Sequence, residues 1–117
     1  MIKVIGLLKR RAGMSVDEFR TYYESQHRLI GEKYLSGHAS RYIRRYLNPQ
    51  DRGLSDEESR PYDVILEIWY PDQTASEAAS ARLSLPEAIA EIVADEEQLF
   101  DRQANRFFTV EEVESDL

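Results

Sequence analysis

The stretch RTYYESQHRLIGEKY, residues 20–34, places one of the chain's two histidines among aromatic and aliphatic residues. Imidazole titrates near neutrality, so His27 can both accept and donate a proton under ordinary conditions. Apolar residues recur around it at spacings of three and four: Phe19, Tyr23, Ile30 and Tyr34. This spacing makes one helix face and predicts that His27 lies on the packing side of a helix. There it is either a proton-transfer group beside a pocket or a core histidine bonded to a carbonyl or a tyrosine hydroxyl.

Aromatic residues are the second feature that could contribute to chemistry. They are Tyr22 and Tyr23 near the histidine, and Tyr42, Tyr46 and Trp69 on strands that the helix must cover. Aromatic walls bind flat apolar ligands, and a phenol hydroxyl can hydrogen-bond a carbonyl or enolate oxygen. We therefore predict that these residues border a substrate pocket. The alternative is that they fill a small core with their polar tips at its edge.

Two arginines on one side of a predicted strand, Arg41 and Arg45, could bind a negatively charged group. A guanidinium binds a carboxylate through two parallel hydrogen bonds, so Arg45 is predicted as a substrate-binding residue. Pairing with a nearby acid such as Glu67 is the alternative. His38 falls at a helix-to-strand turn and is expected to be exposed.

Residues that could hold a metal or cofactor are sparse. The two histidines are eleven positions apart and there is no cysteine, so no usual spacing of metal ligands occurs. We predict no metal site and no cofactor. G-x-S-x-G, phosphate-loop and dinucleotide motifs are also missing, which argues against hydrolase triads and nucleotide chemistry.

The composition predicts one soluble globular domain over residues 1–117, with 42% hydrophobic and 32% charged residues. The net charge of -7 argues against nucleic acid and anionic membranes as partners, because both require a basic surface. No apolar run approaches the roughly 20 residues that span a bilayer. The N-terminal MIKVIGLLKRR has its apolar part before its charges, the reverse of a secretory signal, so a cytoplasmic location is expected.

The elements of the first half follow from short apolar runs and capping signals. IKVIGLLK, residues 2–9, predicts a strand, and SVDE at 15–18 is a capping box that opens a helix to about Tyr34. Residues 39–47 favour a second strand. The segment 48–61 holds Pro, Gly, Ser and charges without periodicity, and is expected to be a long exposed loop of the kind that serves as a lid or binding loop.

The second half repeats the pattern. YDVILEIWY, residues 62–70, predicts a strand, followed by an Ala-rich helix that restarts at Pro86. ANRFFTVEEV, residues 104–113, predicts the last strand, and residues 112–117 a frayed tail. The order β-α-β-β-α-β is typical of a ferredoxin-like α+β fold with an antiparallel sheet. Because the strands are apolar on both sides, we expect a homodimer through the sheet face.

Two stretches resemble a known family. LLKRRAGMSVDEFRTYYESQH is similar to the opening of EthD-domain proteins, in the dimeric α+β barrel superfamily, with the match spanning residues 5–27. YDVILEIWYPD and the Ala-rich helix resemble the second half of that family more loosely. The family usually continues His-Ala-Pro-Leu, whereas this chain has Arg28 and Leu29 after His27.

The resemblance implies a homodimer whose sheets pack face to face and a small-molecule site between the helices and the sheet. Relatives include isomerases, dehydratases, decarboxylases, cofactor-free monooxygenases and haem-binding proteins. We therefore expect cofactor-independent acid/base chemistry by His27 on an apolar carbonyl-bearing or aromatic metabolite, with a tyrosine hydroxyl orienting the oxyanion. The alternatives are a non-catalytic metabolite-binding or accessory dimer and a cofactor-free monooxygenase. Haem ligation by His27 rests on fold analogy alone.

Overall fold

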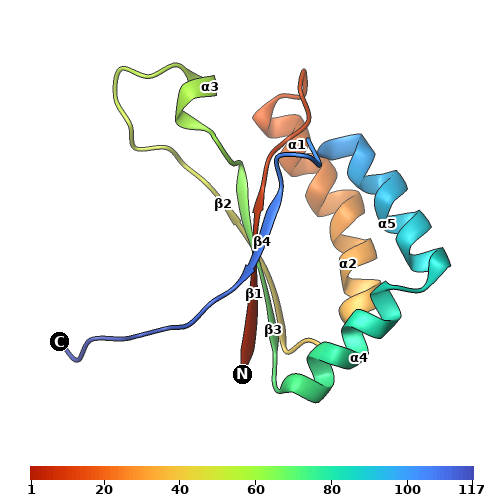
Figure 1. Ribbon diagram of the computed structural model, residues 1–117. Helices are drawn as coiled ribbons and strands as arrows, with labels where there is room; N and C mark the ends of the chain where they lie inside the picture. The colour runs from red at the N-terminus through yellow and green to blue at the C-terminus, as the bar shows by residue number, and fades with distance from the viewer.

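A four-stranded antiparallel sheet forms the centre of the computed structural model, which describes residues 1–117 (Figure 1). Its strands are β1 (Ile2–Leu8), β2 (Arg41–Tyr46), β3 (Val64–Tyr70) and β4 (Arg106–Thr109), in the spatial order β2-β3-β1-β4. Two helical stretches lie side by side in one layer on one face of this sheet, and no helix packs on the other face. This arrangement confirms the predicted α+β, ferredoxin-like fold.

The predicted strands 2–9, 39–47 and 62–70 are confirmed, with ends that differ by one or two residues. The last strand is shorter than the predicted range 104–113, because only four residues pair with β1. Beyond them the chain leaves the sheet edge, so its backbone has no strand to pair with.

The first helical stretch consists of α1 (Val16–Tyr22), η1 (Tyr23–His27) and α2 (Arg28–Leu35), which follow one another directly. The predicted capping box is confirmed at its start. The Glu18 amide donates to Ser15 Oγ at 3.0 Å, and the Ser15 amide donates to the Glu18 carboxylate at 3.3 Å. These bonds satisfy two amides that the helix itself cannot pair.

The middle segment, η1, is a turn of π-helix, so the prediction of one uninterrupted α-helix to about Tyr34 is wrong here. The Arg28 amide donates to the Tyr23 carbonyl, five residues back. A π turn places one additional residue in the helical path and is frequent at functional sites. Spacings of three and four do not reveal it, because it depends on how Tyr23 and His27 pack against other segments.

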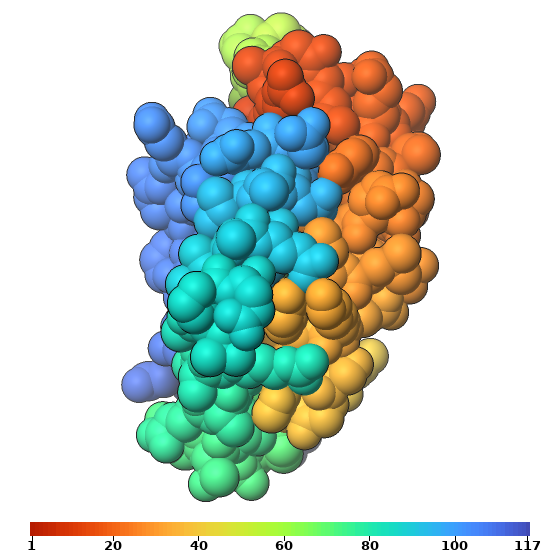
Figure 2. All heavy atoms as spheres, turned by 90° about the vertical axis from the view of Figure 1, so that its right-hand side faces the viewer, coloured from red at the N-terminus to blue at the C-terminus, as the bar shows by residue number.

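The second helical stretch consists of α4 (Gln73–Leu83) and α5 (Pro86–Leu99). Asp72 caps α4 by accepting from the Ala75 amide at 2.8 Å, and Pro86 occupies the first turn of α5, where no amide is needed. Seen from the helix side, α4 and α5 lie beside the first helical stretch and together cover the sheet (Figure 2). None of the helices combines the length and apolar character needed to cross a membrane.

Two segments extend from the sheet on the side opposite the helices (Figure 1). One is the connection from β2 to β3, and the other is the C-terminal segment 110–117, which has no regular secondary structure. The prediction that 48–61 is entirely loop is wrong for α3 (Asp56–Ser59), a single turn capped by Ser55 and Glu58. Its S-x-x-E capping box was present in the sequence, but a turn this short has no apolar periodicity to support it.

The apolar core lies between the sheet and the helices. Its larger cluster is made of Leu8, Phe19, Tyr23, Val64, Leu66, Leu99 and Phe100, and a smaller one of Leu35, Tyr70 and Ala79. Because side chains alternate along a strand, the residues between them in β1 and β3 point to the uncovered face. With their neighbours in register, they form an apolar patch on that face, consisting of Ile5, Leu7, Ile43, Ile65 and Phe108.

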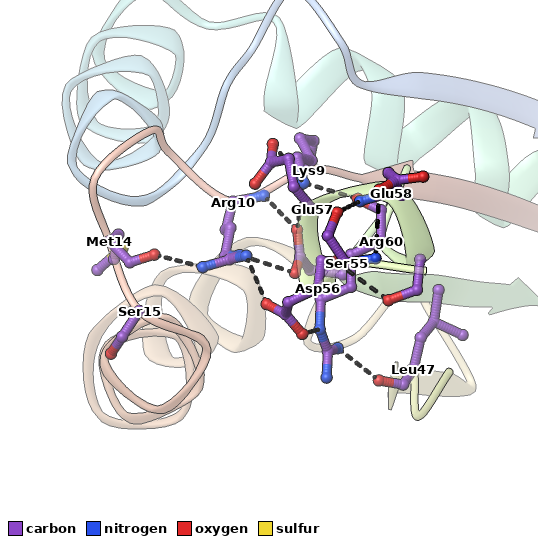
Figure 3. Close-up of polar contacts among 12 residues, drawn as sticks. Lys9, Arg10, Met14, Ser15, Leu47, Ser55, Asp56, Glu57, Glu58 and Arg60 are labelled. Carbon is purple, nitrogen blue, oxygen red and sulfur yellow. Dashed lines mark hydrogen bonds and ion pairs between the residues drawn. The ribbon is translucent and has the colours of Figure 1, made fainter. Parts of the chain in front are cut away.

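Asp63, at the entry to β3, ties this end of the sheet together. Its side chain is 0% exposed and accepts from the Arg10 amide at 2.9 Å and from Arg10 Nε at 3.0 Å. Lys9 Nζ lies 3.6 Å from the same carboxylate. Arg10 also approaches Asp56 at 3.4 Å, and Arg60 Nε donates to Asp56 at 2.9 Å, so these ion pairs join α3 to the end of β1 (Figure 3).

We expect Asp63→Ala to lower the free energy of unfolding by about 3 kcal/mol, because it leaves two largely buried cations without their counter-ion. Urea unfolding followed by circular dichroism would measure this loss. Asp51→Ala, in the exposed part of the same loop, should change it by less than about 0.5 kcal/mol. Equal effects of the two substitutions would show that the buried carboxylate does not hold this end of the sheet.

Candidate functional site

A cavity of about 330 Å³ lies between the helices and the sheet. This volume is within the range of sites that bind small molecules. Its walls are mainly apolar and include Ile30, Leu35, Leu66, Ile68, Ile92 and Phe100. Few polar side chains line it, and each of them is described below.

The cavity opens beside the edge strand β4. Ile89 of α5 and Phe107 of β4 both line it, yet they remain 47% and 56% exposed. Large apolar side chains that are half exposed at a cavity mouth offer contact area to an incoming apolar molecule. Gly6, directly opposite Phe107 in the sheet, leaves room for the Phe107 ring, since a Cβ there would lie 3.0 Å from it.

His27 lines the cavity from the π turn, as the sequence predicted it would face inward. Its side chain is 11% exposed. The ring stands edge-on to the rings of Tyr23 and Phe100, with centroids 5.2 and 5.4 Å away. These contacts fix the plane of the imidazole, and the position of a proton-transfer group depends on that plane.

Asp95 of α5, in the neighbouring helical stretch, holds the imidazole. The distance between His27 Nδ1 and Asp95 Oδ2 is 2.7 Å, and the Tyr22 hydroxyl donates to Asp95 Oδ1 at 2.6 Å. A carboxylate can only accept, so the proton of this bond is on Nδ1. Nε2 has no hydrogen-bond partner in the protein and is not sealed off, so it is the nitrogen available to a bound molecule.

Two tyrosine hydroxyls face each other across the floor of the cavity. Tyr23 and Tyr42 both line it, and their hydroxyl oxygens are 3.3 Å apart. Burial is the main cause that raises the pKa of both phenols, so both remain protonated and able to donate at neutral pH. Gly31 makes this possible, because a Cβ there would lie 2.6 Å from the Tyr42 hydroxyl.

Glu96 is the one carboxylate in the cavity wall. It follows Asp95 in α5, and its side chain is 19% exposed. Burial raises its pKa, while Arg102 and His27 lower it and Asp95 raises it further. It accepts no hydrogen bond from any side chain, and its nearest cation is Arg102, whose Nε is 3.8 Å from Oε1.

Tyr22 and Tyr46 were predicted to border the pocket, but neither lines it. Tyr22 instead orients Asp95, as described above. The Tyr46 hydroxyl donates to Glu24 at 2.5 Å, and Glu24 also accepts from Arg44 Nε and Nη2 at 3.0 and 2.8 Å. These bonds join β2 to the π turn, so Tyr46 positions the element that carries the histidine.

Trp69 and Arg45 lie on the uncovered face of the sheet, and the prediction that they border the same pocket as His27 is wrong. In β3 the buried positions are Val64, Leu66 and Tyr70, so Trp69 alternates to the other side. Its Nε1 donates to Glu67 at 3.1 Å, and Arg45 pairs with the same carboxylate.

This pairing is the alternative that the sequence left open for Arg45. The rings of aromatic residues also attract cations, and Lys3 and Arg41 stack on Trp69 at 4.0 and 4.8 Å from its ring. His38 is part-exposed and lies outside the cavity wall. No group of three or more His, Cys, Asp or Glu side chains is arranged to bind a metal ion.

Asp95 and Glu96 are the two site residues that the sequence did not single out. They belong to the acidic run ADEEQ, which has the composition of a solvated helix face. Their spacing from Ile92 and Leu99, three and four residues along α5, is the one signal that could have placed them on the packing side.

The sequence matches the EthD domain family over residues 11–103. A comparison with curated proteins gives no match. Among similar solved structures is an EthD family protein from Bacillus halodurans, with a TM-score of 0.65, 18% identity, and coverage of 97% of this chain and 99% of the other.

A dimeric protein of unknown function and ferredoxin-like fold from Bacteroides fragilis gives a TM-score of 0.58 at 14% identity, covering 94% of each chain. An antibiotic biosynthesis monooxygenase gives 0.55 at 14% identity, covering 97% of this chain and all (100%) of the other. At identities of 14–18% these similarities establish a shared fold, and they do not assign a reaction to this chain. The family match, which spans most of the chain from the turn after β1 to the turn before β4, shows that this protein belongs to the EthD domain family.

Proposed function

We propose that the protein is a cofactor-independent enzyme that transfers protons on an apolar, carbonyl-bearing or aromatic metabolite. The observation that carries this proposal is the imidazole of His27, held by Asp95 at 2.7 Å on the wall of an otherwise apolar cavity. A proton-transfer group needs a fixed direction and a free ring nitrogen, and apolar surroundings strengthen its interactions. His27 is held by Asp95, makes no protein hydrogen bond through Nε2 and is 11% exposed among mainly apolar walls.

The roles of the individual groups follow from their hydrogen bonds. Asp95 keeps a proton on Nδ1 and compensates the positive charge of the doubly protonated ring, while Nε2 faces the substrate. One of the two phenol protons is used in the bond between Tyr23 and Tyr42, so the pair can donate the other to an oxygen that gains negative charge during the reaction. Isomerisation, dehydration and decarboxylation can all pass through an enolate. Its charged oxygen is on the carbonyl carbon, and the neighbouring carbon is the one that loses a proton or a substituent.

Two alternatives have support of their own. The same cavity would serve a non-catalytic metabolite-binding or accessory protein, since apolar walls alone provide affinity. The similarity to an antibiotic biosynthesis monooxygenase supports a cofactor-free oxygenase. Consumption of dioxygen with an aromatic compound bound in the cavity would identify the second alternative.

The proton-transfer role is tested by exchange in deuterium oxide. A panel of aryl ketones is incubated with the protein, and loss of the proton next to the carbonyl is followed by NMR. We expect His27→Gln to slow the exchange by about 100-fold, and Asp95→Asn by at least about tenfold, because the ring then loses its charge partner.

His38→Gln is the matched control, because it removes the other imidazole of the chain from a position outside the cavity wall. It should exchange at the wild-type rate. Wild-type exchange by His27→Gln would contradict the proposal. Binding of a ketone by the wild-type protein without any exchange would favour the binding protein over the enzyme.

We also propose that two copies pack through the uncovered sheet faces. The apolar patch defined above lies on that face, and no helix covers it (Figure 1). An apolar patch between paired strands is stabilised when a second copy removes it from water. The Bacteroides fragilis protein of similar fold is dimeric, which supports a dimer here.

Sedimentation at micromolar concentration tests the dimer, and we expect a species of twice the 13.6 kDa chain mass. Phe108→Glu places a charge on the apolar patch and should give monomers, because a charge buried without a partner is costly. Leu29→Glu, at an exposed position of α2, should leave the dimer intact. A wild-type protein that sediments only as 13.6 kDa would disprove the dimer.

A further inference from the structure

Glu96 is a largely buried acid in the wall of an apolar cavity. Its side chain is 19% exposed, receives no side-chain hydrogen bond and has a cation, Arg102, 3.8 Å from Oε1. Partial burial of a carboxylate without hydrogen bonds is unfavourable. The neighbouring carboxylate of Asp95, by contrast, is satisfied by two hydrogen bonds at 2.6 and 2.7 Å. Glu96 is therefore the acid of this wall that is left with capacity to bind a further group.

The charges around Glu96 make it a suitable base. Burial raises the pKa of Glu96, and the nearby Asp95 raises it as well, so its carboxylate binds a proton more strongly than in water. Arg102, 3.8 Å away, and His27 lower the pKa and favour the ionised form. These three are the charged groups that act on it from α5, from η1 and from the turn after α5.

We propose that Glu96 is a second catalytic residue, the base that removes a proton from a substrate carbon, while the His27–Asp95 pair gives a proton to the substrate oxygen. This inference rests on the proposed function and assigns the two halves of the proton transfer. Glu96 and His27 line the same cavity from the two neighbouring helical stretches. A substrate that fills the cavity therefore contacts both.

The step balances without any further reactant. The C–H bond next to the carbonyl breaks and its proton moves to Glu96, while its electron pair forms the C=C bond of an enol. The carbonyl oxygen takes the proton from His27 Nε2. When a C=C bond lies beyond that carbon, the enol is a dienol. The O–H proton returns to Nε2 and its electron pair re-forms the C=O bond, the enol C=C pair moves to the next bond, and the pair of the former C=C bond takes the Glu96 proton at its far carbon. This gives a conjugated isomer and restores both residues. The substrate class is an apolar ketone with a C–H bond between its carbonyl and a C=C bond.

The base is tested with 5-nitrobenzisoxazole, a flat aromatic heterocycle that opens when a base removes its one ring proton next to nitrogen. The electron pair of the C–H bond forms a nitrile, the N–O bond breaks, and a coloured nitrophenolate results. A nitrophenolate is stable without a proton, so this reaction requires the base and not the acid. It therefore examines Glu96 separately from His27.

We expect the wild-type protein to open this ring faster than buffer at the same pH. Glu96→Gln, which keeps the size of the side chain but cannot take the proton, should lose about 100-fold, whereas His27→Gln should lose less than about tenfold. Glu97→Gln, at the next and exposed position of α5, is the matched control and should equal the wild type. The urea midpoint of Glu96→Gln should be at or above the wild-type value, which excludes misfolding as the cause.

The pH dependence gives an independent readout. A base acts in its ionised form, so the rate should rise with pH through the raised pKa of Glu96 and then level off. Arg102 lowers that pKa, so Arg102→Gln should move the rising limb to higher pH. If Arg102→Gln leaves the pH at which the rate rises unchanged, this result contradicts the role of Glu96 as the base.

Ring opening at the wild-type rate by Glu96→Gln, or a wild-type protein no faster than buffer, would overturn the inference. Loss of ring opening in His27→Gln alone would assign the base to His27, and would overturn it too. Neither result would touch the proposed function, which fails only if His27→Gln keeps wild-type exchange of the ketone proton.

Discussion

The two hydrogen bonds to Asp95 are the interaction on which the candidate site depends. One carboxylate of α5 binds both Tyr22 of α1 and His27 of the π turn, so it joins the two helical stretches beside the cavity. Without it Nδ1 would lose the acceptor that fixes the tautomer, and only the edge-on contacts with Tyr23 and Phe100 would hold the ring. The same bonds join the two helical stretches that enclose the cavity together with the sheet.

The cavity exists because side chains that could fill it are used elsewhere or are absent. Gly31 gives its space to the Tyr42 hydroxyl, and Gly6 gives its space to the Phe107 ring. Tyr46 and Arg44 are drawn to Glu24, which braces the π turn against β2. An apolar space with few polar groups raises the pKa of the phenols and of Glu96 through burial.

The sheet separates two surfaces with different properties. On the helix side lies the cavity, lined by His27, Glu96 and the tyrosine pair. On the other side, Glu67 pairs with Arg45 and Trp69 beside an apolar patch, and the segment after β4 and the loop with α3 extend toward the same side (Figure 1). The buried charges around Asp63 fix the base of that loop to β1. Residues from the two surfaces cannot act on one ligand, although they alternate along the same strands.

The sequence by itself determined the element order, the ferredoxin-like sheet, the capping box at Ser15 and the inward direction of His27. These follow from local rules, since apolar periodicity and capping act over a few residues. Tertiary structure decided that Asp95 orients the imidazole, that Glu96 reaches the cavity, that a π turn interrupts the first helix, and that Trp69 and Arg45 lie behind the sheet. Each of these depends on which segments meet in space. An acidic run on a helix looks solvated until the packing of that helix shows which of its carboxylates face inward.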